Sequence, residues 1–501
     1  MRKCLYFILI LILLMPNISV FAAIPYMSLG YVPFPSFGHW RLDEDGTRFG
    51  TFFMQTVFKP ASPMPVIGNP LFVDGVSVPG LEAPMDLFID AYDYIYVVDM
   101  SQNRAVKITA QGELIREFGD SEGPGRLRSP EGIFVRRDTG EVYISDTGNF
   151  RVAVFSNEGE FLREITRPYD PRIGDTLFRP ERIGVDSRGF YLLMLKGENR
   201  GLMLLNPNGE FAGFFGANVS QPNIFDRIRA RVYTFSQRLA TQRVQDSISD
   251  LYIDNNGFIY TATATASTEQ IKKFNVGSLN LFRGRNMDIN PLLRLQDGWT
   301  EGIRTSFNSV TVDRNGNVFA LDAGSGRVFM FDQFGEPVLS FGARMMDRNN
   351  ITVGRFGEPT AIRVNSQGTL FVTDRTYRGI IVFTPTPKAQ MIIELNRLFI
   401  DGRYADAVPL AREILRENVF FFNANMVIAH YHFQNQRWEE ARHYFRIALN
   451  TQEYSEAFWE YRLVFIQRNF VYAAMALPVI VFASGIKNVV KRKRKAARDS
   501  Q

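Results

Sequence analysis

Residues 84–119 read PMDLFIDAYDYIYVVDMSQNRAVKITAQGELIREFG, and this stretch decides the fold. A Pro opens an apolar strand, and after a turn a second strand ends in Asp99. A short polar loop ends in Arg104, a third strand follows, and a Gly-Glu turn leads to a fourth strand that ends in Phe-Gly. Val, Ile, Tyr and Phe fill the strands while Gly or Asn occupies the turns, which is typical of antiparallel hairpins.

The same unit recurs between residues 81 and 385, in six copies. Asp99 and Asp146 are 47 residues apart, and Asp322 and Asp374 are 52 apart. Four short strands per unit of about 40–50 residues are typical of a propeller blade. The sequence therefore predicts a mainly β protein with a six-bladed β-propeller over residues 81–385, in which residues 23–80 supply strands that close the ring. The third copy has Leu195 in place of the Asp, and the fourth lacks both the Asp and the Arg.

The strand–Asp–loop–Arg pieces of this repeat resemble those of NHL-repeat propellers. The resemblance is carried by Asp99 with Arg104, Asp146 with Arg151, and Asp322 with Arg327, and Asp374 stands at the equivalent place in the sixth copy. These charges could form a ligand-binding ring, or a blade framework in which each Asp caps a turn and pairs with backbone or Arg. Because repeats share framework more than chemistry, we predict the framework role.

Residues 221–247, between the third and fourth copies, do not follow the strand pattern. Arg residues recur around the sides of a predicted helix there. Its one apolar face is formed by residues at helical spacing: Ile224, Ile228, Val232, Phe235 and Leu239. One interpretation is a helix that lies on anionic lipid or on a partner protein. The other, which we favour, is a lid packed on the propeller with a solvated basic face.

Residues 388–469 follow a helical pattern, after a Thr384–Pro387 stretch that we predict to be a stiff linker. Tyr404-Ala405-Asp406-Ala407 returns as Trp438-Glu439-Glu440-Ala441 after 34 residues, which is the period of tetratricopeptide repeats. The segment resembles about two and a half such repeats. The resemblance implies that small and aromatic residues pack between its helices: Ala407, Ala429, Ala441, Phe445 and Ala448.

Both ends of the chain have membrane-targeting patterns. Residues 1–22 combine Arg2-Lys3, an apolar run and a small-residue cleavage site, which predicts a secretory signal peptide. Residues 470–490 form an apolar run with one charge, long enough to cross a bilayer core of ~30 Å as a helix. The tail over 491–501 marks the cytoplasmic side through its basic residues Lys491, Arg492, Lys493, Arg494 and Lys495. We therefore predict a single-pass protein of the cytoplasmic membrane, with its N-terminal domain extracytoplasmic and its C-terminal tail cytoplasmic.

The charge of the chain agrees with this topology. The 501 residues include 57 Lys plus Arg and 52 Asp plus Glu, for a net charge of +5. The predicted signal and tail contain so many of the basic residues that the remaining body is slightly acidic. The basic balance is thus a topology signal, and no nucleic-acid partner is predicted. A single Cys excludes a disulfide scaffold.

The resemblance to NHL propellers implies two enzyme classes, namely amidating lyases with a histidine-bound zinc and lactonases with a calcium at the ring axis. Of the four histidines, His430, His432 and His443 fall in the helical segment and only His39 precedes the propeller, so a histidine-bound metal in the ring is not expected. Asp and Asn abound in the turns and leave a calcium site open. We predict no catalytic residue, no resident cofactor and no metal ligand, with calcium as the open alternative.

These features together predict a membrane-tethered extracytoplasmic binding or scaffold protein. It would recognise proteins, peptides or glycans through its propeller and its tetratricopeptide-like repeats, and could serve as a subunit of a transport or envelope complex. The alternative is a calcium-dependent enzyme of the lactonase or lyase kind.

Overall fold

The computed structural model describes the following residues: 31–32, 40–42, 48–49, 58–61, 66–119, 122–216, 247–264, 269–283, 305–335, 337–345, 354–417, 419, 421–448 and 450–470. These residues fall into two compact units. The first lies within residues 52–394 and is built of β-sheets, and the second contains three short N-terminal strands and the helical residues from 395 onward.

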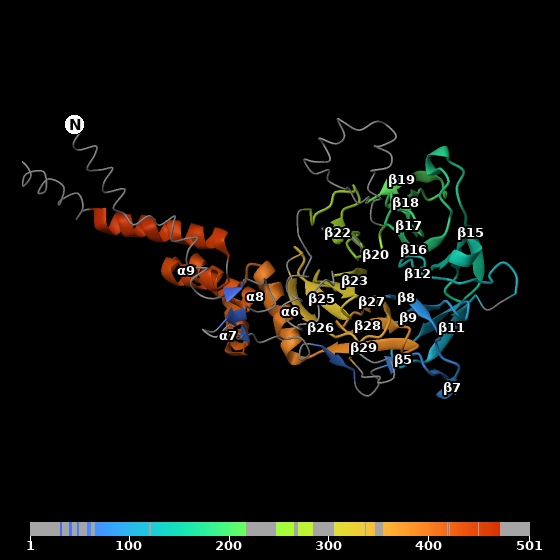
Figure 1. Cartoon of the computed structure of the whole chain (residues 1–501), viewed down its shortest axis with the longest axis horizontal. Helices are drawn as coiled ribbons and strands as arrows, with labels where there is room; N and C mark the ends of the chain where they lie inside the picture. The colour runs from blue at the N-terminus through green and yellow to red at the C-terminus, as the bar shows by residue number, and fades with distance from the viewer. Residues whose placement is uncertain are drawn as a thin grey trace, which may run out of the picture. The chain divides into compact units, whose positions relative to one another are not determined.

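The β unit consists of six antiparallel sheets in chain order, which we call blades one to six (Figure 1). The first three blades have four strands each: β8 (Pro84–Ile89), β9 (Ile95–Asp99), β10 (Arg104–Ile108) and β11 (Leu114–Phe118); β12 (Gly132–Val135), β13 (Val142–Asp146), β14 (Arg151–Phe155) and β15 (Phe161–Ile165); β16 (Pro180–Val185), β17 (Tyr191–Leu195), β18 (Leu202–Leu205) and β19 (Phe211–Phe215).

The last three blades differ in their outer strands. The described strands are β20 (Asp250–Ile253), β21 (Ile259–Ala262) and β22 (Ile271–Phe274); β23 (Phe307–Val312), β24 (Val318–Asp322), β25 (Arg327–Phe331) and β26 (Pro337–Phe341); β27 (Pro359–Val364), β28 (Leu370–Asp374) and β29 (Gly379–Pro385). A separate hairpin pairs β6 (Leu71–Val73) with β7 (Val76–Val78).

The blades form a closed ring around their first strands. β8 contacts β12, β12 contacts β16, and the series continues through β20, β23 and β27 back to β8. These six inner strands surround the centre of the β unit in Figure 1. The six-bladed propeller predicted from the repeat is therefore confirmed.

The N-terminal segment completes the sixth blade. β4 (Phe58–Pro60) pairs with the end of β29, where Pro60 lies opposite Phe383, and β5 (Val66–Ile67) pairs with the same strand at Ile381. A strand from one end of the chain thus covers the edge left by the other end, which removes an unpaired strand edge from the ring.

Apolar clusters between neighbouring blades form the core. The rings of Tyr143 in blade two and Tyr191 in blade three lie 6.0 Å apart between centroids. The stacked rings of Phe58 and Phe341, 4.6 Å between centroids, join the N-terminal strand to blade five. The second strands β9, β13 and β24 are buried at every position, which explains why they read as nearly continuous apolar runs.

The predicted stiff linker over Thr384–Pro387 is wrong. β29 runs to Pro385, with Thr384 and Pro385 paired to β4, and only Thr386 separates it from helix α6 (Pro387–Ile400). Pro387 is the first residue of the helix, where a backbone N–H would make no intrahelical hydrogen bond, so the lack of an N–H in Pro costs nothing there. The two prolines therefore end one element and start another.

The second unit is helical. After α6 come α7 (Tyr404–Glu417), α8 (Phe422–Gln434), α9 (Trp438–Ile447) and a further helix over residues 451–470. A buried cluster between them contains Met426, Ala429, Ala441, Phe445 and Ala448. Ala407 on α7 is also fully buried. The strands β1 (Tyr31–Val32), β2 (Trp40–Leu42) and β3 (Arg48–Phe49) form a small sheet in the same unit.

Several predicted segments lie outside the described residues: the signal peptide over 1–22, residues 221–246 of the insert, residues 471–490 of the predicted span and the basic tail over 491–501. No helix in the described part of the chain is long and apolar enough to cross a membrane.

Candidate functional site

The aspartates predicted as blade framework lie at the ends of the second strands. Each carboxylate accepts hydrogen bonds from backbone N–H groups of the segment that leads into the inner strand of its own blade. The N···O distances are 2.8 and 3.0 Å from Glu82 and Ala83 to Asp99, 2.7 Å from Arg128 to Asp146, 3.0 Å from Ser306 to Asp322, and 2.8 and 3.1 Å from Gly357 and Glu358 to Asp374. We call these four residues the framework aspartates.

The predicted arginine partners behave differently from blade to blade. Arg151 donates from Nε to Asp146 at 2.9 Å. Arg104 instead forms an ion pair with Glu117 of the fourth strand. Arg327 is buried and lies directly opposite Asp322 in the strand register. The framework role of these residues remains a prediction until variants are measured.

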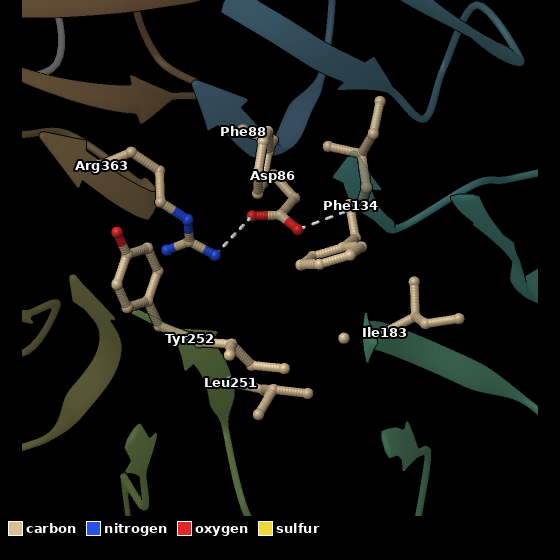
Figure 2. A pocket seen from close by; sticks show the side chains of 10 residues that line it. Asp86, Phe88, Phe134, Ile183, Leu251, Tyr252 and Arg363 are labelled. Carbon is tan, nitrogen blue, oxygen red and sulfur yellow. Dashed lines mark hydrogen bonds and ion pairs between the residues drawn. The ribbon is translucent and has the colours of Figure 1, made fainter. Parts of the chain in front are cut away.

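A second set of charges lies at the axis of the ring, at positions that the repeat pattern did not mark. Asp86 on β8, Arg182 on β16, Asp250 on β20 and Arg363 on β27 have exposed fractions of 1%, 7%, 0% and 4%. We call these four residues the axial cluster. Figure 2 shows Asp86 and Arg363 pointing toward one another from adjacent inner strands.

The two guanidinium groups lie between the two carboxylates. Arg363 is 3.3 Å from Asp86 (Nη2 to Oδ1) and 3.1 Å from Asp250 (Nη1 to Oδ2). Arg182 Nε is 3.4 Å from Asp86 and 3.6 Å from Asp250. The cluster therefore holds two negative and two positive charges and is neutral.

Hydrogen bonds from neighbouring blades support both carboxylates. Asp86 accepts from the backbone N–H of Ile133 at 3.1 Å, and Asp250 accepts from Ser309 Oγ at 2.6 Å and from the N–H of Val310 at 2.9 Å. Such partners are what a buried ion pair needs to offset the cost of removing its charges from water.

The guanidinium groups also donate to backbone carbonyls. Arg182 Nη1 donates to Glu131 at 2.7 Å, and Arg363 Nη1 donates to Ile362 at 2.7 Å. The chain passes close to Arg182 at Gly132, where an added Cβ would come within 2.3 Å of the carbonyl oxygen of Glu181. Gly at this position thus lets the inner strands of blades two and three approach each other.

The two axial carboxylates differ electrostatically. Burial raises the pKa of Asp86, and the attraction of Arg182 and Arg363 only partly offsets it. Burial acts in the same direction on Asp250, but the guanidinium groups of Arg363 and Arg182 outweigh it and lower the pKa of Asp250. The denser hydrogen bonding around Asp250, from Arg363 and Ser309, accounts for the difference.

Side chains fill the axis next to this cluster. The cavity lined by Asp86, Tyr252 and Arg363 has a volume of about 10 Å³ (Figure 2). This is about the space that one water molecule requires. This cavity, lined by described residues, is therefore too small for a substrate.

A larger cavity of about 320 Å³ opens at one end of the axis, and we call it the mouth. It shares Tyr252 with the small axial cavity. Its walls come from the turns between the first and second strands of five blades, and its polar lining residues are Asp90, Asp93, Arg137, Asp254, Asn255, Asn256, Asp313, Arg314, Asn365 and Ser366.

The acidic residues of the mouth are engaged in turn structure. Asp254 Oδ1 accepts from the N–H groups of Asn256 and Phe258 at 2.9 and 2.8 Å, and Asp90, Asp313 and Asn365 make the same pair of bonds in their own turns. Asp93 accepts from the N–H and Oγ of Ser366, at 2.9 and 2.6 Å, and so joins blade one to blade six.

In the described ranges, no group of three or more His, Cys, Asp or Glu side chains is arranged to hold a metal ion. His430 Nε2 lies 2.9 Å from Glu453 Oε2, and the His430 ring stacks on Tyr404, both within the helical unit. His432 stacks on Tyr444, and His39 lies outside the described residues.

The axial charges were missed because they do not recur. In each inner strand, one residue is the first to pair in regular register with the second strand. In blades one to six this residue is Asp86, Gly132, Arg182, Asp250, Ser309 and Ala361. The sequence did contain a signal, namely a charged residue inside an apolar strand: Asp86 in PMDLFI (Pro84–Ile89) and Arg182 in PERIGV (Pro180–Val185). A buried strand seldom keeps a charge without a partner, so such a residue indicates a second one elsewhere.

Comparison with known proteins adds little to this geometry. No known protein family matches the chain, and no curated protein does. Among solved structures, the chain is similar to a virginiamycin B lyase from Staphylococcus aureus, with 12% identity, a TM-score of 0.35, and 70% of this chain and 88% of that chain covered.

Two further solved structures are similar at the same level. A gluconolactonase from Xanthomonas campestris has 12% identity and a TM-score of 0.38, with 61% of this chain and 87% of that one covered. A hydrazine synthase of Kuenenia stuttgartiensis has 10% identity and a TM-score of 0.37, with 63% and 99% covered. At these identities and scores the likenesses carry no argument about activity.

Proposed function

We propose that this chain is a binding or scaffold protein that recognises its ligand at the mouth of the propeller and performs no chemistry at the axis. The observation that carries the proposal is the axial cluster. Its two carboxylates are each within 3.6 Å of both guanidinium groups, so the charge available to hold a cation is already compensated.

This geometry weighs against a calcium-dependent lactonase or lyase at the axis. Calcium takes six to eight oxygen ligands at about 2.3–2.6 Å, and carboxylates are its usual ligands in proteins. A calcium ion beside Asp86 or Asp250 would have to displace Arg182 and Arg363, leaving two guanidinium groups buried without their partners. Such uncompensated buried charge costs several kcal/mol.

The helical unit is proposed as a second recognition module, similar to tetratricopeptide repeats. Two features support this: the 34-residue spacing of Tyr404 and Trp438, and the burial of Ala407, Ala429, Ala441 and Ala448 between helices. We further propose that the chain is exported and tethered to the membrane by residues 470–490, as the terminal sequence patterns predict.

Calcium titration and a lactone assay test the absence of axial chemistry. Full-length protein in detergent is expected to bind no stoichiometric calcium by calorimetry and to hydrolyse no aliphatic or sugar lactone, with or without added calcium. Stoichiometric calcium that disappears in Asp86→Asn or Asp250→Asn, together with turnover lost on chelation, would contradict the proposal.

Photocrosslinking tests the mouth as the recognition site. A photoreactive amino acid replaces Asn256, which is exposed and lines the mouth, and the matched control carries it at the exposed Asn208, outside the mouth. Irradiation in the native cells is expected to give a covalent adduct from position 256 and none from position 208. Equal adducts from both positions, or none from position 256, would count against recognition at the mouth.

A further inference from the structure

We infer that the mouth is a saccharide-binding site, and this inference rests on the proposed function above. The cavity of about 320 Å³ lies at the small end of the range for ligand pockets, roughly 300–1,000 Å³. Its walls are polar, which distinguishes it from the predominantly apolar pockets that hold drug-like ligands.

The acceptors of the mouth are rigid before any ligand arrives. Asp254, Asp313 and Asn365 each cap their own turn with two backbone hydrogen bonds of 2.8–3.0 Å. The Asp93–Ser366 bonds fix two of the turns relative to each other. A carboxylate has about four lone-pair sites, so each capped Asp can still accept from a hydroxyl group. Preorganised groups lose little entropy on binding, which favours affinity for a small ligand.

Two cationic donors complement these acceptors. Arg137 and Arg314 line the mouth from blades two and five. Neither forms a hydrogen bond or an ion pair with any residue that the structure describes. Their guanidinium groups are therefore free to donate several hydrogen bonds to ligand oxygens.

Tyrosines supply the apolar surface that a sugar ring needs for stacking. Tyr252 is half-buried where the mouth meets the axial cavity, and its hydroxyl donates to the carbonyl of Val312 at 3.4 Å. Tyr92, at the turn between the mouth residues Ala91 and Asp93, is 85% exposed. Tyr offers a flat apolar face and a polar tip, which suits the C–H face and the hydroxyl rim of a pyranose.

The balance of charges excludes the simpler ligands. Four carboxylates around the mouth outnumber its two guanidinium groups and repel a phosphate or another compact anion. Among the residues that the structure describes, no three acidic side chains are grouped so that they could hold a metal ion. An apolar ligand would strip water from these groups without replacing their hydrogen bonds. Hydroxyl groups both donate and accept, so a polyhydroxylated ligand can satisfy the carboxylates, the amides and the guanidinium groups together.

An oligosaccharide microarray tests the inference with the full-length chain. The array carries neutral hexose oligosaccharides and uronate-containing oligosaccharides, and calorimetry with the best-bound oligosaccharide follows. We expect binding of at least one class. We expect the double variant Arg137→Ala/Arg314→Ala to weaken it at least about tenfold, because each lost bond involves a charged donor.

Two further variants separate ligand contact from general damage. Tyr92→Ala removes an exposed ring and is expected to weaken binding severalfold without a change in melting temperature. Arg188→Ala is the matched control, because Arg188 lies in the corresponding turn of blade three but does not line the mouth. It should leave the affinity unchanged.

The outcomes distinguish this inference from the proposed function. No binding to the array, or full affinity in the Arg137→Ala/Arg314→Ala variant, overturns the saccharide inference. If position 256 then still gives an adduct that protease digests, the mouth is a peptide or protein site and the proposed function stands. If neither experiment gives a mouth-dependent signal, both are overturned.

Discussion

The framework aspartates and the axial cluster place the same kind of residue in two different roles. Asp99, Asp146, Asp322 and Asp374 recur at one position of the repeat and bind backbone N–H groups near them. The axial Asp86 and Asp250 occupy one position of the inner strands, but the other four blades place Gly, Arg, Ser and Ala there. The recurring aspartates bind groups of their own blade, whereas the axial aspartates bind groups of other blades.

This difference gives the two sets different energetic consequences. A framework aspartate supports one connection, so its loss concerns one blade. An axial charge has partners in several blades, and removing it leaves an opposite charge buried without compensation. We therefore expect the loss of folding stability to be largest for variants of the axial cluster, smaller for variants of the framework aspartates, and smallest for variants of surface ion pairs.

The largest effect is expected for Arg363→Met. The variant leaves Asp86 and Asp250 with Arg182 as their one remaining cation and should lower the free energy of unfolding by about 3–5 kcal/mol. Urea unfolding followed by tryptophan fluorescence and circular dichroism measures it. Arg363→Met combined with Asp250→Leu removes one charge of each sign and should recover part of the loss. A loss under about 1 kcal/mol in the single variant would show that the cluster is not a charge-compensated unit.

A smaller effect is expected for Asp374→Ala. The carboxylate accepts from the N–H groups of Gly357, Glu358 and Thr376 at 2.8–3.1 Å, and its loss should cost about 1–3 kcal/mol. The matched control is Asp138→Ala, an exposed turn residue paired with Arg136, which should cost less than about 1 kcal/mol. If the two variants unfold at the same urea concentration, the framework role of Asp374 is wrong.

The two axial carboxylates should respond to pH in opposite directions. The lowered pKa of Asp250 contributes stability that is present above pH 3.8 and is lost as the pH falls below it. The raised pKa of Asp86 means that the folded protein holds this proton longer, so stability falls as the pH rises from 3.8 through the folded pKa.

Melting temperatures from pH 2.5 to pH 7 (roughly the window in which carboxyl groups titrate) measure this difference. The advantage of the wild type over Asp250→Asn should shrink toward acid, while its stability relative to Asp86→Asn should shrink toward neutral pH. If the stability difference between wild type and variant changed with pH in the same direction for both variants, the opposite pKa shifts of Asp86 and Asp250 would be refuted.

The smallest effect is expected for Arg403→Ala on the helical unit. Arg403 pairs with Asp406 at 2.6 Å, but both side chains are more than half exposed. Solvent screens such a pair, so the change should stay within about 0.5 kcal/mol. A melting shift as large as that of Asp374→Ala would remove the contrast between surface pairs and the framework.

Strand content, blade number and turn positions could be predicted from the sequence, because they depend on local patterns. The turn that begins at Asp254, for example, is defined by hydrogen bonds within four residues. The axial cluster could not be predicted in this way. Asp86 and Arg363 are 277 residues apart, and their strands become neighbours only when the ring closes. The linker expected at Thr384–Pro387 failed for the same reason, since pairing with β4 extends β29 through Pro385.

By itself, the sequence determined a six-bladed β-propeller followed by helices, since apolar strand runs, turn residues and helical spacing act over a few residues. Tertiary structure decided what the ring encloses. It brought two carboxylates and two guanidinium groups from four separate strands within 3.6 Å, and it left a polar mouth above a filled axis. The physical reason is that a buried charge is tolerated only with a partner, and only closure of the ring supplies that partner.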